Sequence, residues 1–92
     1  MVEKNYIINN RLGLHARPAS LFVKTTGRFT SSVKIVKDGQ EIDGKSIMGL
    51  LMLAAGPGTE LKVVVDGPDE NDVITAIDDL FSRHFDDDIE GE

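Results

Sequence analysis

The residues from Gly13 to Ser20, Gly-Leu-His-Ala-Arg-Pro-Ala-Ser, place one histidine and one arginine at the expected start of a helix. Pro18 has no amide hydrogen and a fixed φ, so the helix must open between His15 and Pro18. The backbone amides of Ala16 and Arg17 then precede the first intrahelical hydrogen bonds and point along the positive end of the helix dipole. A helix start of this kind binds anions.

The chemistry that suits this stretch is the transfer of a phosphoryl group. Imidazole titrates near neutral pH, so a histidine can offer a neutral, nucleophilic ring nitrogen. The helix start and the Arg17 guanidinium disfavour a positive charge on the His15 ring before reaction and stabilise a dianion after it. Phosphoryl transfer depends mainly on positioning and charge neutralisation. At this point a plain structural interpretation, in which His15 caps the helix or fills space, remains open.

Seven elements are expected from the spacing of apolar residues. Alternation predicts strands at residues 2–9, 32–37, 40–43 and 60–66. A spacing of three or four predicts one helix from Ala16 to about Arg28 and another that follows Asp69 and reaches His84. Ser46 is a good N-cap for a short helix over residues 47–53.

Turn and capping residues mark where these elements begin and end. Asp38-Gly39 is a strong signal for a hairpin between the second and third strands. Asp69, with Asp72 three residues later, resembles a capping arrangement at the start of the last helix. His84, near the end of that helix, is interpreted as a surface group that complements the dipole, not as a second active site.

The order strand, helix, strand, strand, short helix, strand, helix predicts an α/β (α+β) fold. We expect an open-faced two-layer sandwich, in which three helices cover one face of a four-stranded antiparallel sheet. The chain of 92 residues is long enough for one core, so residues 1–85 are assigned to a single domain. Residues 86–92 are assigned to an acidic C-terminal tail.

The short helix over residues 47–53 is apolar nearly all round, with the sequence Ile-Met-Gly-Leu-Leu-Met-Leu. A helix of this length can bury only some of these side chains, so two or three must remain near the surface. Core packing and an interaction patch are both possible reasons for such a run. Both can hold for different side chains of the same helix.

Composition and charge exclude several classes of function. The net charge is −6, but residues 11–45 hold seven basic and three acidic side chains, which suits an acidic partner and is too weak for nucleic acid. The chain has no cysteine and only two distant histidines, so we expect no metal site. No apolar run is long enough for a signal peptide or a membrane span, which favours a cytoplasmic protein.

With these residues placed, the chain resembles HPr, the family of histidine-containing phosphocarrier proteins of the bacterial sugar phosphotransferase system. The resemblance covers residues 3–82 in length and element order, βαββαβα. Its specific parts are Gly13-Leu14-His15-Ala16-Arg17-Pro18-Ala19, Lys45-Ser46-Ile47-Met48-Gly49, and Asp69-Glu70-Asn71 before the last helix. The first two of these motifs, at matching spacing, are together far more specific than either one alone.

The resemblance implies a role for each motif. His15 would be phosphorylated on Nδ1 by enzyme I, which uses phosphoenolpyruvate, and would pass the group to an enzyme IIA. Arg17 and the backbone amides at Ala16 and Arg17 would hold the phosphoryl group. Ser46 would be the target of an HPr kinase/phosphorylase, and a catabolite-control transcription regulator is a further implied partner.

The resemblance also implies how partners are met. The side chains expected to contact them are Ser20, Lys24, Ile47, Met48 and Leu51. The protein would be a monomeric phosphoryl carrier, not an enzyme, and would need no cofactor or metal.

Alternatives of other kinds remain open. One is a nitrogen-branch or mainly regulatory HPr relative that acts through Ser46 and not through sugar uptake. Another is an acylphosphatase, which has a related sandwich, but its phosphate-cradling Val-x-Phe-Arg pattern is missing from this sequence. A third is a small ligand-binding or interaction module with no covalent chemistry.

Overall fold

The computed structural model describes residues 1–9, 13–83 and 85. The elements, in chain order, are β1 (Val2–Ile7), α1 (Ala16–Thr26), β2 (Ser32–Lys37), β3 (Gln40–Asp43), α2 (Ile47–Met52), β4 (Glu60–Asp66) and α3 (Glu70–Ser82). The predicted order βαββαβα is confirmed. The predictions for His84 and for the tail at residues 86–92 lie outside the described residues.

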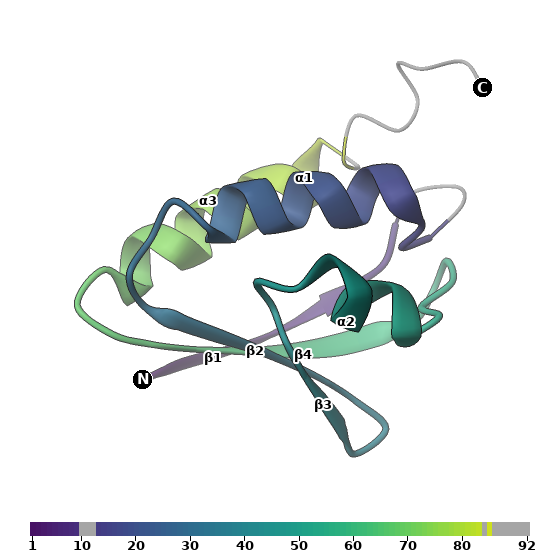
Figure 1. The fold of residues 1–92 in the computed structure, drawn as a ribbon, viewed down its shortest axis with the longest axis horizontal. Coiled ribbons are helices and arrows are strands. Elements are labelled where there is room, and N and C mark those ends of the chain that lie inside the picture. The colour runs from purple at the N-terminus through teal and green to yellow at the C-terminus, as the bar shows by residue number, and fades with distance from the viewer. Residues whose placement is uncertain (10–12, 84, 86–92) are drawn as a thin grey trace.

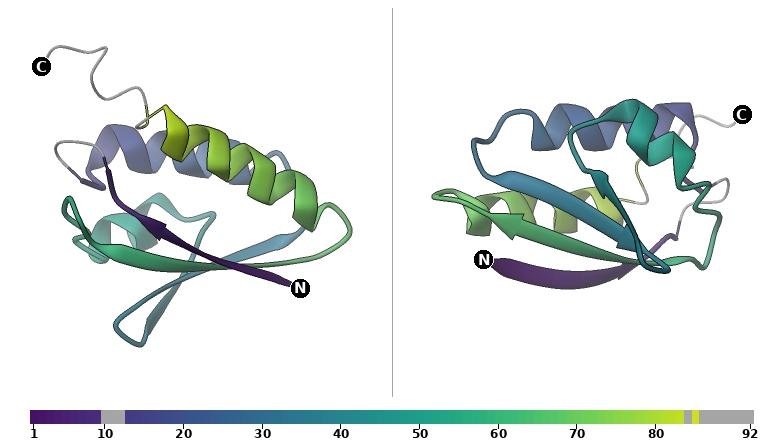
Figure 2. Two further views of the ribbon diagram at one scale, coloured as in Figure 1. Left: turned by 180° about the vertical axis from the view of Figure 1, so that it is seen from behind. Right: turned by 60° about the horizontal axis from the view of Figure 1, so that its bottom comes forward.

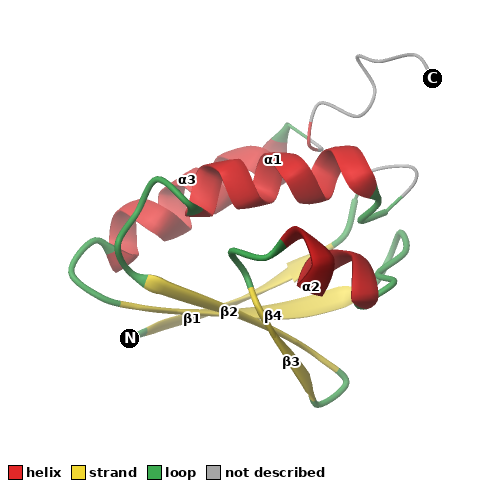
Figure 3. Cartoon of the chain, viewed as in Figure 1, coloured by secondary structure: helices red, strands yellow, loops and turns green. Residues whose placement is uncertain are grey.

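The four strands form one antiparallel sheet in the order β1-β4-β2-β3. All three helices lie on one face of this sheet, and the other face carries no helix (Figures 1, 2 and 3). The predicted open-faced two-layer sandwich is therefore confirmed. Helices α1 and α3 run side by side, and the shorter α2 lies beside α1 over the β3 side of the sheet (Figure 1).

The core lies between the sheet and the helices because alternate strand residues face the helical layer. In β2 and β4 these residues are Val33, Ile35, Leu61, Val63 and Val65, and each is at most 4% exposed. The helices supply buried side chains at helical spacing, which are Ala19, Phe22, Leu50, Val73, Ile77, Leu80 and Phe81. Full burial of each large apolar side chain contributes about 1.5–3 kcal/mol, so this shared layer fixes where the helices sit.

The ends of some elements differ from the sequence prediction. Helix α1 ends at Thr26, whose hydroxyl donates a hydrogen bond of 2.9 Å to the Gly44 carbonyl, and the helix does not reach Arg28. Strand β1 ends at Ile7, although Ile8 is buried and its amide donates to the Thr59 carbonyl at 2.9 Å. These limits are set by contacts with distant segments, which a local pattern does not contain.

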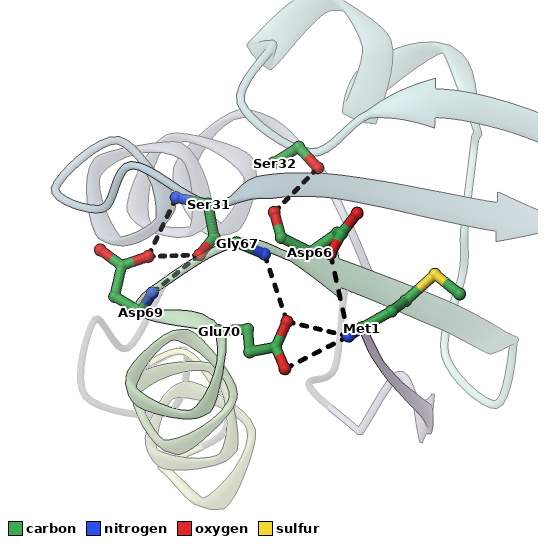
Figure 4. Close-up of polar contacts among 7 residues, drawn as sticks. All are labelled: Met1, Ser31, Ser32, Asp66, Gly67, Asp69 and Glu70. Carbon is green, nitrogen blue, oxygen red and sulfur yellow. Dashed lines mark hydrogen bonds and ion pairs between the residues drawn. The ribbon is translucent and has the colours of Figure 1, made fainter.

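Asp69 is the N-cap residue of α3, as the sequence predicts, but its carboxylate makes no capping bond to the helix. It instead accepts a hydrogen bond from the Thr30 amide at 3.0 Å. It also accepts from the Ser31 amide at 2.9 Å and from the Ser31 hydroxyl (Figure 4). The Ser31 hydroxyl and these amides hold the pKa of Asp69 at about 2. Asp69 therefore joins the start of α3 to the segment between α1 and β2.

Glu70, the residue after Asp69, binds the ammonium group of Met1. Its carboxylate accepts from the Gly67 amide at 3.2 Å and lies 3.1 Å from the Met1 ammonium (Figure 4). Hydrogen bonding to the ammonium is the main cause that lowers the pKa of Glu70.

Among the described residues, no helix is long and apolar enough to cross a membrane, and no group of acidic, histidine or cysteine side chains could hold a metal.

Candidate functional site

His15 is the N-cap residue of α1, which identifies the helix start that the sequence left between His15 and Pro18. Its backbone is extended, with φ −109° and ψ −165°, and its carbonyl accepts the first helical hydrogen bond from the Ala19 amide at 3.0 Å. The amides of Ala16 and Arg17 precede that bond at the positive end of the helix. Pro18 is the third helical residue and is buried, where its missing amide hydrogen costs no helical hydrogen bond.

Histidine is an unusual residue at an N-cap, where serine, threonine, aspartate and asparagine are preferred. In the described part of the chain, the His15 ring makes no capping hydrogen bond to the amides of α1. The residue is half-buried, and its Nε2 atom is covered by protein. Departures from local preference of this kind are typical of functional or strained sites.

The loop before His15 packs directly against the loop that follows α2. The Leu14 amide donates a hydrogen bond of 2.8 Å to the Ala55 carbonyl, and Leu14 is only 7% exposed. Gly13 has φ +75°, and a Cβ atom at this position would lie 2.5 Å from the Ala55 carbonyl oxygen. The two loops can approach this closely only because residue 13 is glycine.

The other candidate residues of α1 follow His15 along the helix. Arg17 is exposed, Ser20 is half-buried and Lys24 is exposed. Residues three and four apart lie on the same helix face, so these three side chains form one row that leads away from His15. Arg17, Ser20 and Lys24 therefore share one face of α1, which begins directly after His15.

Ser46 is the N-cap of α2, as the sequence predicts. Its hydroxyl oxygen accepts a hydrogen bond from the Gly49 amide at 3.1 Å, and its carbonyl accepts from Leu50 at 3.1 Å. The residue is half-buried, so part of it remains open to solvent. Ser46 therefore has a structural role that does not occupy its hydroxyl proton.

Helix α2 buries one face and exposes the other. Leu50 is fully buried and Leu51 packs partly against the core. Ile47, Met48 and Met52 are 40%, 68% and 68% exposed, and we call these three the α2 apolar surface. The prediction that two or three side chains of this helix stay near the surface is confirmed.

Met52 is a surface residue that the sequence reasoning missed, because Leu51 was preferred as the third contact. The spacing of four between Met48 and Met52 was the available signal, since residues four apart share a helix face. Helix α1 lies beside α2 in the helical layer (Figure 1).

Comparisons with known proteins agree on one family. Residues 2–83 match the family described as the PTS HPr component phosphorylation site. The phosphocarrier protein HPr of Treponema pallidum is 47% identical over 92% of this chain and 97% of its own length. The HPr-like protein Crh of Halalkalibacterium halodurans is 46% identical over 84% of this chain and 92% of its own length.

A solved structure supports the same assignment at the level of the fold. The crystal structure of HPr-C-His from Thermoanaerobacter tengcongensis has a TM-score of 0.89 and 41% identity, covering 92% of this chain and 96% of that one. Fold, sequence and motif agree over nearly the whole described chain. The chain belongs to the HPr family of phosphocarrier proteins of the phosphotransferase system.

Proposed function

We propose that His15 accepts a phosphoryl group from phosphorylated enzyme I and passes it to the enzyme IIA of a sugar permease in the bacterial cytoplasm. The protein then serves as a monomeric carrier that is consumed and regenerated, and it works without a cofactor. The observation that supports this most directly is the position of His15 as N-cap of α1, with Nε2 covered and the residue still half-exposed.

The covered Nε2 atom favours Nδ1 as the nitrogen that reacts. A neutral ring with its proton on Nε2 attacks phosphorus through the Nδ1 lone pair. The new nitrogen–phosphorus bond forms as the bond to the donor breaks, and the donor retains that electron pair. The Ala16 and Arg17 amides and the Arg17 guanidinium neutralise the charge of the bound dianion.

The partners meet the side of the helical layer that carries this histidine. The α2 apolar surface supplies unpaired apolar area, and Ser20 and Lys24 extend the contact along α1. A carrier must exchange partners quickly, so a modest interface of this kind suits its work. The positive charge of Arg17 and Lys24 favours partners with an acidic surface.

Ser46 is the site where we place regulation, by an HPr kinase/phosphorylase. A phosphoryl group there would add charge of about −1.5 to −2 at the start of α2, where the helix dipole tolerates it. It would also stand beside Ile47 and Met48 and repel acidic partners of the α2 apolar surface. A catabolite-control transcription regulator is the partner that this modified form would recruit.

A mainly regulatory role through Ser46 is the second candidate. The observation that favours it is the 46% identity to an HPr-like protein named Crh. The presence of His15 favours the phosphoryl-carrier function, because only that function needs a nucleophile at the start of α1.

Incubation with enzyme I and labelled phosphoenolpyruvate tests the carrier directly. The carrier predicts one label per chain that is acid-labile and base-stable, that is lost in His15→Ala and that is retained in Ser46→Ala. Circular dichroism of His15→Ala checks that the fold is intact. Absence of label on the wild-type chain, with an enzyme I that labels a known HPr, would favour the regulatory role.

A further inference from the structure

A basic groove runs between α1 and α3, and none of its lining residues belongs to α2. Its lining residues are Leu21, Lys24, Thr25, Arg28, Leu80 and Arg83, and its volume is about 480 Å³. We call it the α1/α3 groove. Three of its six lining side chains are cationic and exposed, which is a strong local excess in a chain of net charge −6.

The charges of the groove are only partly neutralised. Asp79 lies 3.0 Å from the Arg83 Nε atom, one turn earlier on α3. Among the described residues, Lys24 and Arg28 have no carboxylate within ion-pair distance, and Arg28 lies over the ring of its neighbour Phe29. The groove therefore keeps about two positive charges on the α1 side for an acidic ligand.

The floor of the groove is apolar. Leu80 is 2% exposed and Leu21 is half-buried against the core, and both lie between the cations. A ligand that fits this surface must present carboxylates to the rim and an apolar side chain to the floor. This combination is the chemistry of an acidic peptide with one aliphatic residue.

The end of this chain has that chemistry. Residues 86–92 read Asp-Asp-Asp-Ile-Glu-Gly-Glu, with five carboxylates around Ile89. They follow Phe85, which is fully buried and packs edge-on against the Phe81 ring at 4.9 Å between centroids. Phe85 thus fixes the starting point of the tail two residues beyond Arg83, which lines the groove.

The tail is long enough to cover the groove. Seven extended residues span about 23–25 Å, whereas Leu21 and Arg28 are separated by about 10 Å along a helix. A short tether also holds the tail at an effective concentration on the order of millimolar, so weak charge pairs suffice to populate the contact.

We propose that residues 86–92 bind in the α1/α3 groove of the same chain, with carboxylates at Lys24 and Arg28 and with Ile89 toward Leu21 and Leu80. Lys24 is also an expected partner contact, so the bound tail competes with an acidic partner. This competition rests on the proposed function, whereas the intramolecular contact does not.

A paramagnetic label tests the contact in the full chain. The sequence has no cysteine, so Gly91→Cys provides a unique attachment point for a nitroxide. The contact predicts broadening of the Thr25 and Arg28 amide signals in low salt. A matched control carries the same label with Asp86→Asn, Asp87→Asn, Asp88→Asn, Glu90→Gln and Glu92→Gln, which preserve length and shape and remove all five side-chain charges of the tail.

In the neutral-tail control the broadening at Thr25 and Arg28 should fall severalfold. It should fall similarly in the acidic-tail protein at high salt, where exposed charges are screened, and in the double variant Lys24→Gln, Arg28→Gln. Equal broadening in the acidic and neutral tails would overturn the proposal, as would preferential broadening at Lys34 and Lys62 on the opposite face of the sheet.

A mixed sample identifies the occupant. Protein that carries the nitroxide but no nitrogen-15 is mixed with nitrogen-15 protein that carries no nitroxide. Only contacts between two chains can then broaden the observed signals. The intramolecular contact predicts no broadening at Thr25 and Arg28 in this sample, whereas broadening there would assign the groove to the tail of a second copy and overturn the proposal. Because no phosphoryl group is involved, the result is independent of whether His15 proves to be a carrier.

Discussion

The Leu14 amide and the Ala55 carbonyl are joined by a hydrogen bond of 2.8 Å, which fixes the residue before His15 to the loop after α2. The helix that begins at Ser46 and the helix that begins at His15 are therefore linked by backbone as well as by side-chain packing. The position of the histidine depends on this contact between the two loops.

Gly13→Ala should displace the His15 loop. The new Cβ atom would lie 2.5 Å from the Ala55 carbonyl oxygen, and the backbone at residue 13 has φ +75°. We expect the free energy of unfolding to fall by about 2 kcal/mol or more, because the strain of a positive φ adds to the clash. We also expect slower phosphoryl transfer from enzyme I. Urea denaturation and transfer rates measure the two effects.

Gly39→Ala is the matched control for Gly13→Ala. Gly39 has a similar φ of +82°, but a Cβ atom there would meet nothing within 4 Å. Gly39→Ala should lose only the stability that the positive φ costs, about 1 kcal/mol. Its rate of phosphoryl transfer from enzyme I should be unchanged. Equal transfer rates in the two variants would contradict the role of the loop contact.

Ala54→Gly should stabilise the protein. Ala54 has φ +52° just after α2, a left-handed conformation that glycine adopts without steric cost. We expect a gain of about 0.4–1 kcal/mol in the free energy of unfolding. Ala76→Gly, inside α3, should instead destabilise by about 1 kcal/mol, so a loss in both variants would show that strain at residue 54 is not relieved.

Asp69→Asn should weaken the protein at neutral pH and change its response to acid. The pKa of Asp69 is held at about 2, below its ordinary value of 3.8. A lowered folded-state pKa contributes stability above pH 3.8 that is lost as the pH falls toward 2. The stability difference between wild type and Asp69→Asn should therefore shrink over that interval when unfolding is followed at several pH values.

Asp38→Asn provides the comparison for this acid titration, because Asp38 is exposed in the β2–β3 turn. Between pH 4 and pH 2 the Asp69→Asn difference should change more than the Asp38→Asn difference, because the contacts with Thr30 and Ser31 belong to Asp69. If Asp69→Asn behaves in the same way, the contacts of Asp69 with Thr30 and Ser31 do not stabilise the folded chain.

Ser46→Asp should slow phosphoryl transfer to His15 with little change in the fold. The aspartate carboxylate accepts a hydrogen bond from the Gly49 amide, as the serine hydroxyl does, but it places a negative charge beside Ile47 and Met48. Ser46→Ala separates the two roles: it should lose about 0.5–2 kcal/mol of capping energy and keep its transfer rate. Equal rates for Ser46→Asp and wild type would remove the electrostatic explanation.

Met52→Ser should weaken binding of enzyme I by several-fold with little effect on unfolding, because 68% of this residue is exposed on the α2 apolar surface. Isothermal titration against enzyme I measures the affinity. Ile7→Ser is the control, since Ile7 is 52% exposed on β1, outside the helical layer. Equal losses in the two variants would mean that the α2 apolar surface is not where enzyme I binds.

Local patterns predicted much of this fold because they carry their own physical causes. The Asp38-Gly39 signal requires two residues with positive φ, and the structure has φ +49° and +82° there. Ser46 caps α2 with its own hydroxyl, which is a bond within four residues. Such features need no knowledge of the rest of the chain.

Features that depend on distant partners were not predictable in this way. Asp69 looked like a helix cap, but its carboxylate is engaged by Thr30 and Ser31, nearly 40 residues earlier. The contact of Gly13 with the Ala55 loop also joins segments that are far apart in sequence. For the site, the sequence proposes His15 and Arg17 by residue type, whereas the covered Nε2 atom emerged only from packing.

Nitrogen-15 NMR of the His15 ring after phosphorylation by enzyme I and phosphoenolpyruvate is the most direct test. The ring nitrogens have distinct shifts, so the spectrum identifies which one carries phosphorus. We predict that the phosphoryl group is on Nδ1 and that Nε2 keeps its proton. Phosphorus on Nε2, or an unmodified His15 ring in a chain that has nonetheless taken up phosphate, would contradict the account.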